Sequence, residues 1–241
     1  MILIILASGT GNRLKSKTKK IPKCLVKVNN KPIIEYMNKF IDCFNKVFIV
    51  VGYKANNLKK LLKDKKIKFV YNKNYNSTNM VHSIFCASKY INDDVVISYS
   101  DIIFDYSIFK LFKKKKTLMP IKKDWIEVWK KRMDYKNIKN DAENLVIKGN
   151  KLVSIGGKIG KVLPKYQFMG LIKIIYKDFL KMKKFYIKLN KKKIDFTSFI
   201  NLMLLNKTIS INCAKTDRFW YEIDTYKDLN SANKILKNIK L

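Results

Sequence analysis

The stretch that decides the fold opens the chain and reads Met1-Ile2-Leu3-Ile4-Ile5-Leu6-Ala7-Ser8-Gly9-Thr10-Gly11-Asn12-Arg13-Leu14. Its first six residues are apolar and a glycine-containing turn follows at once, which is typical of a buried strand that ends in a loop. The glycines allow backbone N–H groups to turn toward an anion, and Arg13 adds a fork for two phosphate oxygens. The stretch therefore predicts a strand followed by a loop that holds a triphosphate.

A lysine beyond this loop makes the pattern more specific. Lys23 follows Pro22 and adds a second cation. The pattern is not a Walker loop, because no Gly-Lys-Ser/Thr follows at the required spacing, and it is not a dinucleotide fingerprint, because Leu14 stands at the third glycine position. A purely structural turn would use the same glycines, so it is the combination with Arg13 and Lys23 that favours phosphate binding.

Short apolar runs alternate with helical patterns through the first half of the chain. Strands are predicted at residues 1–6, 47–51, 67–71 and 95–98, and helices at 32–44, 56–63 and 78–90. This alternation is typical of parallel strands joined by right-handed helical crossovers. We expect an α/β fold: a Rossmann-like open twisted mixed sheet, mostly parallel, with helices on both faces and a ligand crevice at the carboxyl ends of the strands.

The second half is less regular. Strands are predicted near 117–121, 143–148, 152–156, 167–174, 209–213 and 219–223, and helices near 177–185, 196–206 and 226–239. A polar insert that carries two tryptophans follows the first of these strands. No linker rich in glycine, proline or serine divides the chain, so we expect one domain over residues 1–241 with a small acceptor-binding insert at about 123–165.

The charge is strongly basic, with 52 lysines and arginines against 18 acidic residues and a net charge of +34. Taken alone, this charge would suggest a nucleic-acid or anionic-membrane partner. Only Arg13, Arg132 and Arg218 are arginines, and the lysine runs 113–116 and 191–193 have no interleaved aromatic residues for base stacking. We therefore expect a solvated basic surface and no nucleic-acid partner, and a basic nucleic-acid-binding protein remains the alternative from another class.

The cysteines and the apolar runs bear on the compartment. Cys24, Cys43, Cys86 and Cys213 show no C-x-x-C pair or paired spacing, which indicates reduced thiols in a cytoplasmic protein. The N-terminal apolar run lacks a basic region before it, and no run reaches transmembrane length. The sequence therefore predicts neither a signal peptide nor a membrane partner.

Five segments carry a family resemblance. They are Leu6 to Leu14, Ile21-Pro22-Lys23-Cys24-Leu25, Lys31-Pro32-Ile33-Ile34, Ser98-Tyr99-Ser100-Asp101 and Tyr221-Glu222-Ile223-Asp224-Thr225. Together they resemble the sugar-phosphate and small-substrate nucleotidylyltransferases, although the family's usual second alanine is Ser8 here. The resemblance runs to about residue 235 and is weakest in the middle. It implies a nucleotide site made of Leu6, Ala7, Ser8, Gly9, Thr10, Gly11, Asn12, Arg13 and Lys23.

The same resemblance implies a metal site. It makes Asp101 and Asp224 the ligands of Mg²⁺, and Lys23, Arg13, Asp101 and Asp224 the catalytic residues. Mg²⁺ prefers carboxylate and phosphate oxygens, so one or two carboxylates suffice to hold it against a triphosphate. Each aspartate has an alternative role as a helix N-cap, Asp101 for the segment after it and Asp224 for the helix at 226–239. The metal role requires that the two aspartates meet at one rim of the sheet.

A polar segment at 72–83 is where the resemblance places recognition of the base. Asn79 and Ser83 lie four residues apart on one face of a predicted helix, and amide and hydroxyl groups can pair with the edge of a pyrimidine. A polar loop with an ordinary N-cap is the alternative. His82, the only histidine, is expected to be a packing or surface residue.

The short length and the segment ending at Asp224 look most like the CTP-dependent branch, which acts on phosphocholine, aminoalkylphosphonates and phosphoglutamine. The resemblance places the acceptor in the insert, where Asp141 and Glu143 would hold an ammonium, an aromatic face of Trp125 or Trp129 would cover it, and Arg132 would bind phosphate or carboxylate. A surface hairpin with half-buried tryptophans is the alternative. Trp220 is expected in the core or at the edge of the acceptor pocket.

The reaction that these resemblances imply is transfer of CMP from CTP to a phosphorylated or phosphonylated acceptor, with release of pyrophosphate and a role in capsule or other cell-surface polysaccharide modification. The acceptor phosphate is already a nucleophile at neutral pH, so no general base is required. A sugar-1-phosphate nucleotidylyltransferase is the alternative enzyme, because the tryptophans and Arg132 would also suit a sugar ring.

Overall fold

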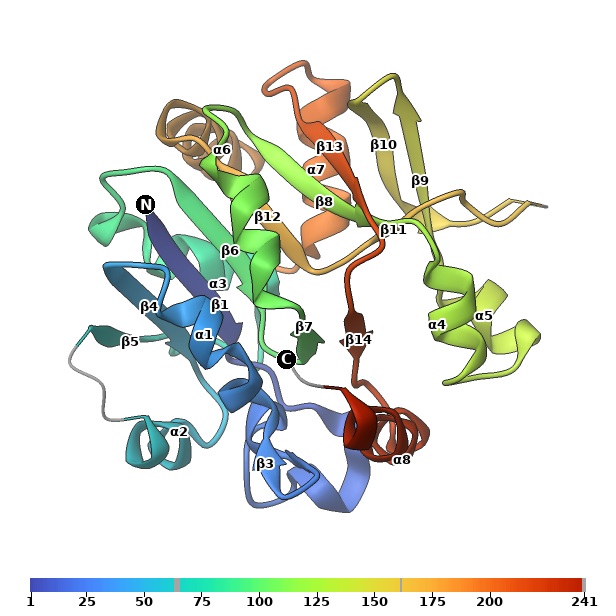
Figure 1. Cartoon of the computed structure of the whole chain (residues 1–241). Helices are drawn as coiled ribbons and strands as arrows, with labels where there is room; N and C mark the ends of the chain where they lie inside the picture. Colours follow the sequence, from blue (N-terminus) through green and yellow to red (C-terminus); the bar gives the residue numbers. More distant parts are fainter. Residues whose placement is uncertain (63–65, 161, 240–241) are drawn as a thin grey trace.

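A large twisted sheet runs through the molecule (Figure 1). The structure is a computed structural model that describes residues 1–62, 66–160 and 162–239. The strand order is β5-β4-β1-β6-β12-β8-β13-β10-β9, and β11 pairs with β8. Four strands of the first half lie parallel side by side in this sheet: β1 (Ile2–Ala7), β4 (Lys46–Val51), β5 (Ile67–Tyr71) and β6 (Val95–Tyr99). Their bounds agree with the sequence prediction to within one residue. Between β1 and β4, the two short strands β2 (Lys27–Val28) and β3 (Lys31–Pro32) pair only with each other.

The strands of the second half extend this sheet, mainly by antiparallel pairing. They are β8 (Leu118–Lys122), β9 (Glu143–Lys148), β10 (Lys151–Lys158), β11 (Gln167–Phe168), β12 (Leu171–Ile174) and β13 (Asn212–Thr216). The predicted single strand at 167–174 is interrupted because Gly170 adopts a left-handed conformation, with φ +74°. The strand predicted at 209–213 lies three residues further along, where it pairs parallel to β8.

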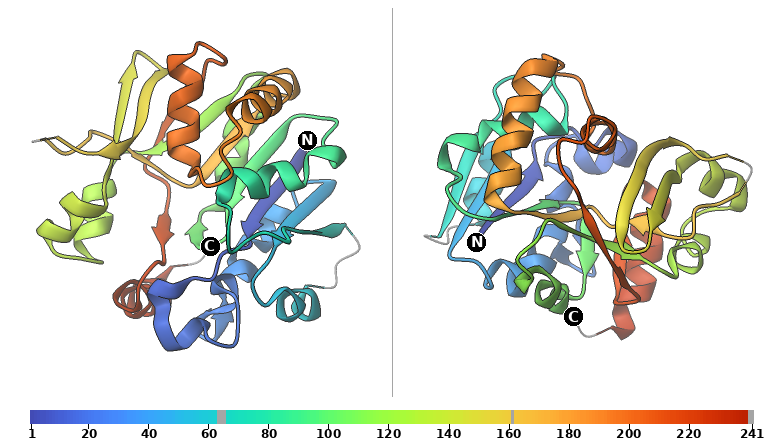
Figure 2. Two further views of the ribbon diagram at one scale, coloured as in Figure 1. Left: turned by 180° about the vertical axis from the view of Figure 1, so that it is seen from behind. Right: turned by 90° about the horizontal axis from the view of Figure 1, so that it is seen from above.

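Helices cover both faces of the sheet, as expected (Figures 1 and 2). On one face lie α3 (Met80–Cys86), α6 (Tyr176–Leu189) and α7 (Phe196–Leu205), and on the other lie α1 (Asn38–Ile41) and a 3₁₀ segment at Tyr106–Lys113. The alternation of β1 separates the two cores, since Ile2, Ile4 and Leu6 pack with the first set and Leu3, Ile5 and Ala7 with the second. The mixed α/β fold with helices on both faces is thereby confirmed.

Two helix predictions need correction. Residues 32–44 form a 3₁₀ segment, Ile33–Met37, followed by the short α1, because the side chains of this segment serve two cores. Ile33 packs in a third cluster beneath α8 (Tyr226–Ile235), whereas Phe40 packs against the sheet. The helix predicted at 78–90 divides into α3 and a separate 3₁₀ turn, Ser88–Tyr90. The helix predicted at 56–63 appears as α2 (Ala55–Leu61), and residue 63 lies outside the described residues.

The insert forms two short helices before the hairpin of β9 and β10. They are α4 (Trp125–Lys130) and α5 (Tyr135–Asp141), which lie beside the C-terminal half of the sheet in Figure 1. Trp125 and Trp129 are both buried and meet edge to face, with ring centroids 5.2 Å apart. The two tryptophans therefore build a local core instead of a half-exposed hairpin.

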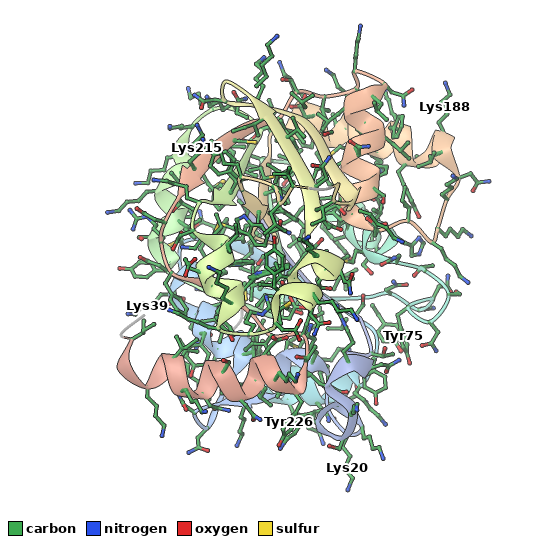
Figure 3. All side chains as sticks on the ribbon, turned by 90° about the vertical axis from the view of Figure 1, so that its right-hand side faces the viewer. Lys20, Lys39, Tyr75, Lys188, Lys215 and Tyr226 are labelled. Carbon is green, nitrogen blue, oxygen red and sulfur yellow. The ribbon has the colours of Figure 1, made fainter. Side chains whose placement is uncertain are left out.

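Lysine side chains project from several sides of the molecule. In Figure 3, Lys20, Lys188 and Lys215 point outward at widely separated places, and all three are exposed. Among the described residues, none of the helices has the length and apolar character that crossing a bilayer requires.

Candidate active site

The loop after β1 is shaped by one glycine. Gly11 adopts the left-handed conformation, with φ 65° and ψ 33°, and its carbonyl accepts hydrogen bonds from the Leu14 N–H at 3.0 Å and the Thr18 hydroxyl at 3.0 Å. A Cβ at this position would lie 2.9 Å from the Cβ of Lys23. The turn therefore brings the backbone of the loop directly against the base of Lys23.

Lys23 bridges the two aspartates that the sequence singles out. Its Nζ lies 2.6 Å from Asp101 Oδ2 and also donates to Asp224 Oδ1. Arg13 Nη2 lies 3.0 Å from the same oxygen of Asp224, and Arg13 Nη1 lies 3.8 Å from Asp141 Oδ1. The structure thus brings all four predicted catalytic residues together.

A short two-stranded ribbon explains how residues so far apart in sequence meet. Strand β7 (Ile102–Phe104) pairs antiparallel with β14 (Trp220–Glu222), so that Ile102 faces Glu222. The Ile223 N–H then donates to the Asp101 carbonyl at 3.0 Å, which fixes Asp101 beside the residue that precedes Asp224. Neither aspartate caps a helix: a strand follows Asp101, and the N-cap of α8 is Thr225, which forms a capping box with Asp228.

A third carboxylate belongs to this group, and the sequence interpretation missed it. Ligand oxygens of Asp101, Glu222 and Asp224 all lie within 4.8 Å of one another. Asp101 Oδ1 is buried and has no hydrogen-bond partner among the described residues. The signal was present, because Glu222 stands two residues before Asp224, a spacing that places side chains on one face where the chain is extended. Three carboxylates with an unsatisfied oxygen fit the hard, oxygen-preferring character of Mg²⁺.

The charges at this site perturb one another. Burial by itself would lower the pKa of Lys23, but the charges of Asp101 and Asp224 outweigh it and raise this pKa above its usual value. Burial would raise the pKa of Asp224, whereas Lys23 and Arg13 hold it below its usual range. Burial, reinforced by the charge of Asp224, raises the pKa of Glu222 to about 8. Carboxylates crowded in this way favour the binding of a cation or a proton.

The larger of two adjoining cavities lies over the loop and has a volume of about 440 Å³. We call it the nucleotide cavity, after the residues expected to bind the nucleotide. All the residues expected to bind the nucleotide line it, namely Leu6, Ala7, Ser8, Gly9, Thr10, Gly11, Asn12, Arg13, Lys23, Asn79 and Ser83. Asn79 caps α3 by accepting from the Met80 N–H at 2.7 Å. Ser83 is only 1% exposed, and its hydroxyl bonds Ser8 Oγ at 2.8 Å and Asn72 Nδ2 at 3.0 Å. The hydroxyl of Ser8 therefore ties the loop to α3.

The smaller cavity, of about 170 Å³, adjoins the first at Arg13, Glu222 and Asp224. We call it the acceptor cavity. Four of the residues expected to bind the acceptor line it: Trp129, Asp141, Glu143 and Trp220. Burial, with the nearby charge of Asp224, raises the pKa of Asp141, and burial raises that of Glu143. Sequence reasoning missed Gln167, Phe168, Asp195 and Thr197, which come from β11 and the start of α7.

Two residues of the predicted acceptor set lie outside this cavity. Trp125 is buried in the core of the insert and donates its indole N–H to the Pro164 carbonyl at 3.0 Å. The Arg132 side chain has no exposed surface, and its guanidinium donates to both carboxylate oxygens of Asp228, at 3.0 and 3.2 Å. Arg132 therefore has no free face for an acceptor phosphate. His82 contacts the Tyr186 hydroxyl at 2.8 Å and is a packing residue.

Comparison with known proteins decides the family. A family model described as a MobA-like NTP transferase domain matches residues 3–113. The CTP:phosphoglutamine cytidylyltransferase of Campylobacter jejuni is 33% identical over 250 aligned positions, which cover 95% of this chain and 98% of that protein. The chain belongs to the nucleotidylyltransferase family. The choline-phosphate cytidylyltransferase of Streptococcus pneumoniae is 34% identical over 106 residues, which are 43% of this nucleotidylyltransferase and 46% of that protein.

Solved structures of other nucleotidylyltransferases share the fold. The inositol-1-phosphate CTP transferase of T. maritima superposes with a TM-score of 0.77 at 20% identity, covering 100% of this chain and 98% of that one. The CTP:phosphocholine cytidylyltransferase of Streptococcus pneumoniae gives a TM-score of 0.78 at 20% identity, covering 98% and 99%. At this identity, the likeness supports the fold of the nucleotidylyltransferase.

Proposed function

We propose that this nucleotidylyltransferase transfers a cytidylyl group from CTP to a small acceptor that carries a phosphate or phosphonate, and releases pyrophosphate. The observation that carries the proposal is the position of Lys23 and Arg13, which contact Asp224 where the nucleotide cavity meets the acceptor cavity. The relatives that use CTP with phosphoglutamine and with choline phosphate support this nucleotide and this class of acceptor.

The chemistry needs positioning and charge neutralisation. An acceptor phosphate oxygen attacks the α-phosphorus of CTP, the bond from that phosphorus to the bridging β-phosphate oxygen breaks, and its electron pair leaves with pyrophosphate. A phosphate dianion carries no proton that must be removed, so the site needs no general base. Lys23 holds the α-phosphate and the incoming phosphate against each other, and Arg13 with the loop amides neutralises the leaving pyrophosphate.

We assign Mg²⁺ to Asp101 and Asp224, with Glu222 beside them. The support is the crowding of the three carboxylates and the unsatisfied Oδ1 of Asp101. When bound, Mg²⁺ neutralises charge on the triphosphate and so favours departure of pyrophosphate. Lys23 pairs with both aspartates and so neutralises part of their charge and holds them close together.

A pyrophosphate-release assay tests the reaction. CTP, UTP, ATP and GTP are each combined with phosphocholine, aminoethylphosphonate, phosphoglutamine and hexose-1-phosphates. We expect release with CTP and one of the three small acceptors. Preference for a hexose-1-phosphate would instead support a sugar-1-phosphate nucleotidylyltransferase. The absence of pyrophosphate from every combination would refute the proposed function.

The metal assignment has its own test. Asp101→Asn should abolish the stimulation of turnover by Mg²⁺ and weaken the Mg²⁺-dependent gain in CTP affinity measured by calorimetry. Asp217→Asn is the matched control, because Asp217 is exposed and outside both cavities. Mg²⁺-stimulated turnover at the wild-type rate in Asp101→Asn would remove this residue from the metal site.

We place the reaction in the cytoplasm, where its CMP-activated product would serve the modification of surface polysaccharide. The four cysteines are free thiols, which suits a reducing compartment. Cell fractionation tests the compartment, and analysis of the surface polysaccharide after deletion of the gene tests the pathway.

A further inference from the structure

Two residues that line the acceptor cavity each carry a buried polar atom that has no hydrogen-bond partner in the described part of the chain. Gln167 is 5% exposed and its Oε1 has no hydrogen-bond partner among the described residues, and the same holds for the Nε1 of Trp129, which is 3% exposed. Both residues line the acceptor cavity. Buried polar groups in native proteins are nearly always paired, so such exceptions at a cavity indicate where a ligand completes the hydrogen bonding.

The carboxylates of the cavity add negative charge around these groups. Glu143 Oε1 and Asp195 Oδ1 lie 2.9 and 3.0 Å from the hydroxyl of Thr197, which holds the two carboxylates on one side of the cavity. Asp141 lies at the side that Arg13 approaches. Charge alone would attract any ammonium, whether or not its nitrogen carries hydrogens.

Four aromatic residues line the cavity, and the contacts they already make limit the ring surface left for a quaternary ammonium. Two of them, Tyr99 and Phe168, meet edge to face with ring centroids 5.8 Å apart. Such an ion is recognised by the free faces of several aromatic rings. Here the guanidinium of Arg132 already lies over the ring of Trp129, 5.1 Å from its centroid, and Trp125 meets Trp129 edge to face. Trp220 is 2% exposed and donates its indole N–H to the Met169 carbonyl. Trp129 and Trp220 therefore offer little free ring surface.

We propose that the acceptor cavity selects a phosphorylated compound whose nitrogen carries N–H donors, a primary ammonium or an amide, over one with a quaternary ammonium, and that Gln167 determines this specificity. The proposal rests on the proposed cytidylyl transfer and deepens it. A primary ammonium offers N–H donors to the Gln167 amide oxygen and to Glu143. A quaternary ammonium has no N–H to donate, so it leaves the buried Gln167 oxygen unpaired, and a site built to hydrogen-bond a substrate group rejects the analogue that lacks it.

Phosphoethanolamine and phosphocholine provide a matched pair, because they differ only in the methyl groups on nitrogen. With CTP and wild-type protein, kcat/KM from pyrophosphate release should favour phosphoethanolamine by about tenfold or more. Gln167→Met should reduce kcat/KM for phosphoethanolamine about tenfold and leave the phosphocholine value within about threefold of wild type. Gln167→Glu retains an acceptor oxygen and should retain the preference. Melting temperatures of both variants report folding independently of activity.

The outcomes separate this proposal from the proposed function. A wild-type preference for phosphocholine, or an unchanged ratio in a folded Gln167→Met, overturns the selectivity while leaving cytidylyl transfer in place. If another acceptor is used instead of this pair, both compounds are measured as competitive inhibitors, and a phosphocholine inhibition constant equal to or below that of phosphoethanolamine overturns the proposal. Absence of pyrophosphate with every acceptor refutes the proposed function itself. If Gln167→Met fails to fold, the proposal is still tested by the wild-type comparison of the two acceptors, and a loss of the preference in a folded Gln167→Glu would overturn it.

Discussion

Replacing Gly11 with alanine should damage both the stability and the catalysis of this nucleotidylyltransferase. Gly11 sits at φ +65°, and an added Cβ would lie 2.9 Å from the Cβ of Lys23 and 3.2 Å from the Cγ2 of Thr18. Atoms this close must move apart. The group displaced is the base of Lys23, whose Nζ bridges Asp101 and Asp224.

The expected cost follows from two contributions. The left-handed conformation costs a residue with a Cβ roughly 1–2 kcal/mol, of which about 0.4–1 kcal/mol is offset because alanine restricts the unfolded chain. Crowding in a packed site adds roughly 1–3 kcal/mol. The free energy of unfolding of Gly11→Ala should therefore fall by about 2–4 kcal/mol. A displacement of Lys23 on the order of 1 Å should lower kcat about a hundredfold.

Another glycine separates the two contributions. Gly149 has φ +58° in the turn between β9 and β10, and a Cβ there would meet no atom of the described residues within 4 Å. Gly149→Ala should therefore lose only about 1 kcal/mol and keep wild-type turnover. Urea denaturation and pyrophosphate release with the preferred acceptor give the two readouts. The reasoning is refuted if Gly11→Ala unfolds at the same urea concentration as Gly149→Ala and keeps wild-type kcat.

Three further substitutions test separate parts of the site. Lys23→Ala should lower kcat on the order of 10² or more, because it removes a preorganised cation, and a wild-type kcat in a pyrophosphate-release assay would exclude Lys23 from catalysis. Arg132→Met should lower the free energy of unfolding, measured in urea, by about 3–5 kcal/mol, because it leaves Asp228 buried without its cation; a loss within about 0.5 kcal/mol would contradict this. Burial would raise the pKa of Asp195, but hydrogen bonds from Ser198 and Thr197 hold this pKa below its usual value. Ionised Asp195 therefore stabilises the fold at pH values above its ordinary pKa, and this stabilisation is lost as the pH falls through the lowered pKa. Asp195→Ala should therefore lower the free energy of unfolding, measured in urea, by about 1 kcal/mol at pH 7 and by less at pH 3. Asp195→Asn is the control, because asparagine keeps the helix cap. An equal loss at both pH values would refute the assignment.

Local patterns explain why the first half of the fold was predictable. Each of β1, β4, β5 and β6 is a largely apolar run bounded by turn residues. Strands β1, β4 and β5 pair in the order in which they follow one another, and β6 pairs with the other side of β1. The 3₁₀ segment at Ile33–Met37 was missed because its side chains serve two cores, which a single helical periodicity does not anticipate. The break at Gly170 depends likewise on its surroundings, since Tyr99 packs against that glycine.

The convergence of the carboxylates was accessible only through the family resemblance. It depends on β7 and β14, two strands of three residues each whose pairing spans more than a hundred residues of sequence. No local pattern marks such a partner. Once the ribbon is known, Glu222 at the end of β14 lies two residues before Asp224, and its carboxylate joins those of Asp101 and Asp224 as the third of the site.

The structure gives Arg132 a different role from the predicted binding of phosphate or carboxylate on the acceptor. An arginine in a polar insert is usually exposed, but here it reaches Asp228 in the first turn of α8. Asp228 Oδ2 also accepts from the N–H groups of Asp224 and Thr225, at 3.0 and 2.7 Å. One carboxylate thus links the buried guanidinium to the backbone of the predicted metal ligand. Arg132 therefore acts on the site by positioning Asp224, and its loss should disturb the nucleotide cavity before it affects the choice of acceptor.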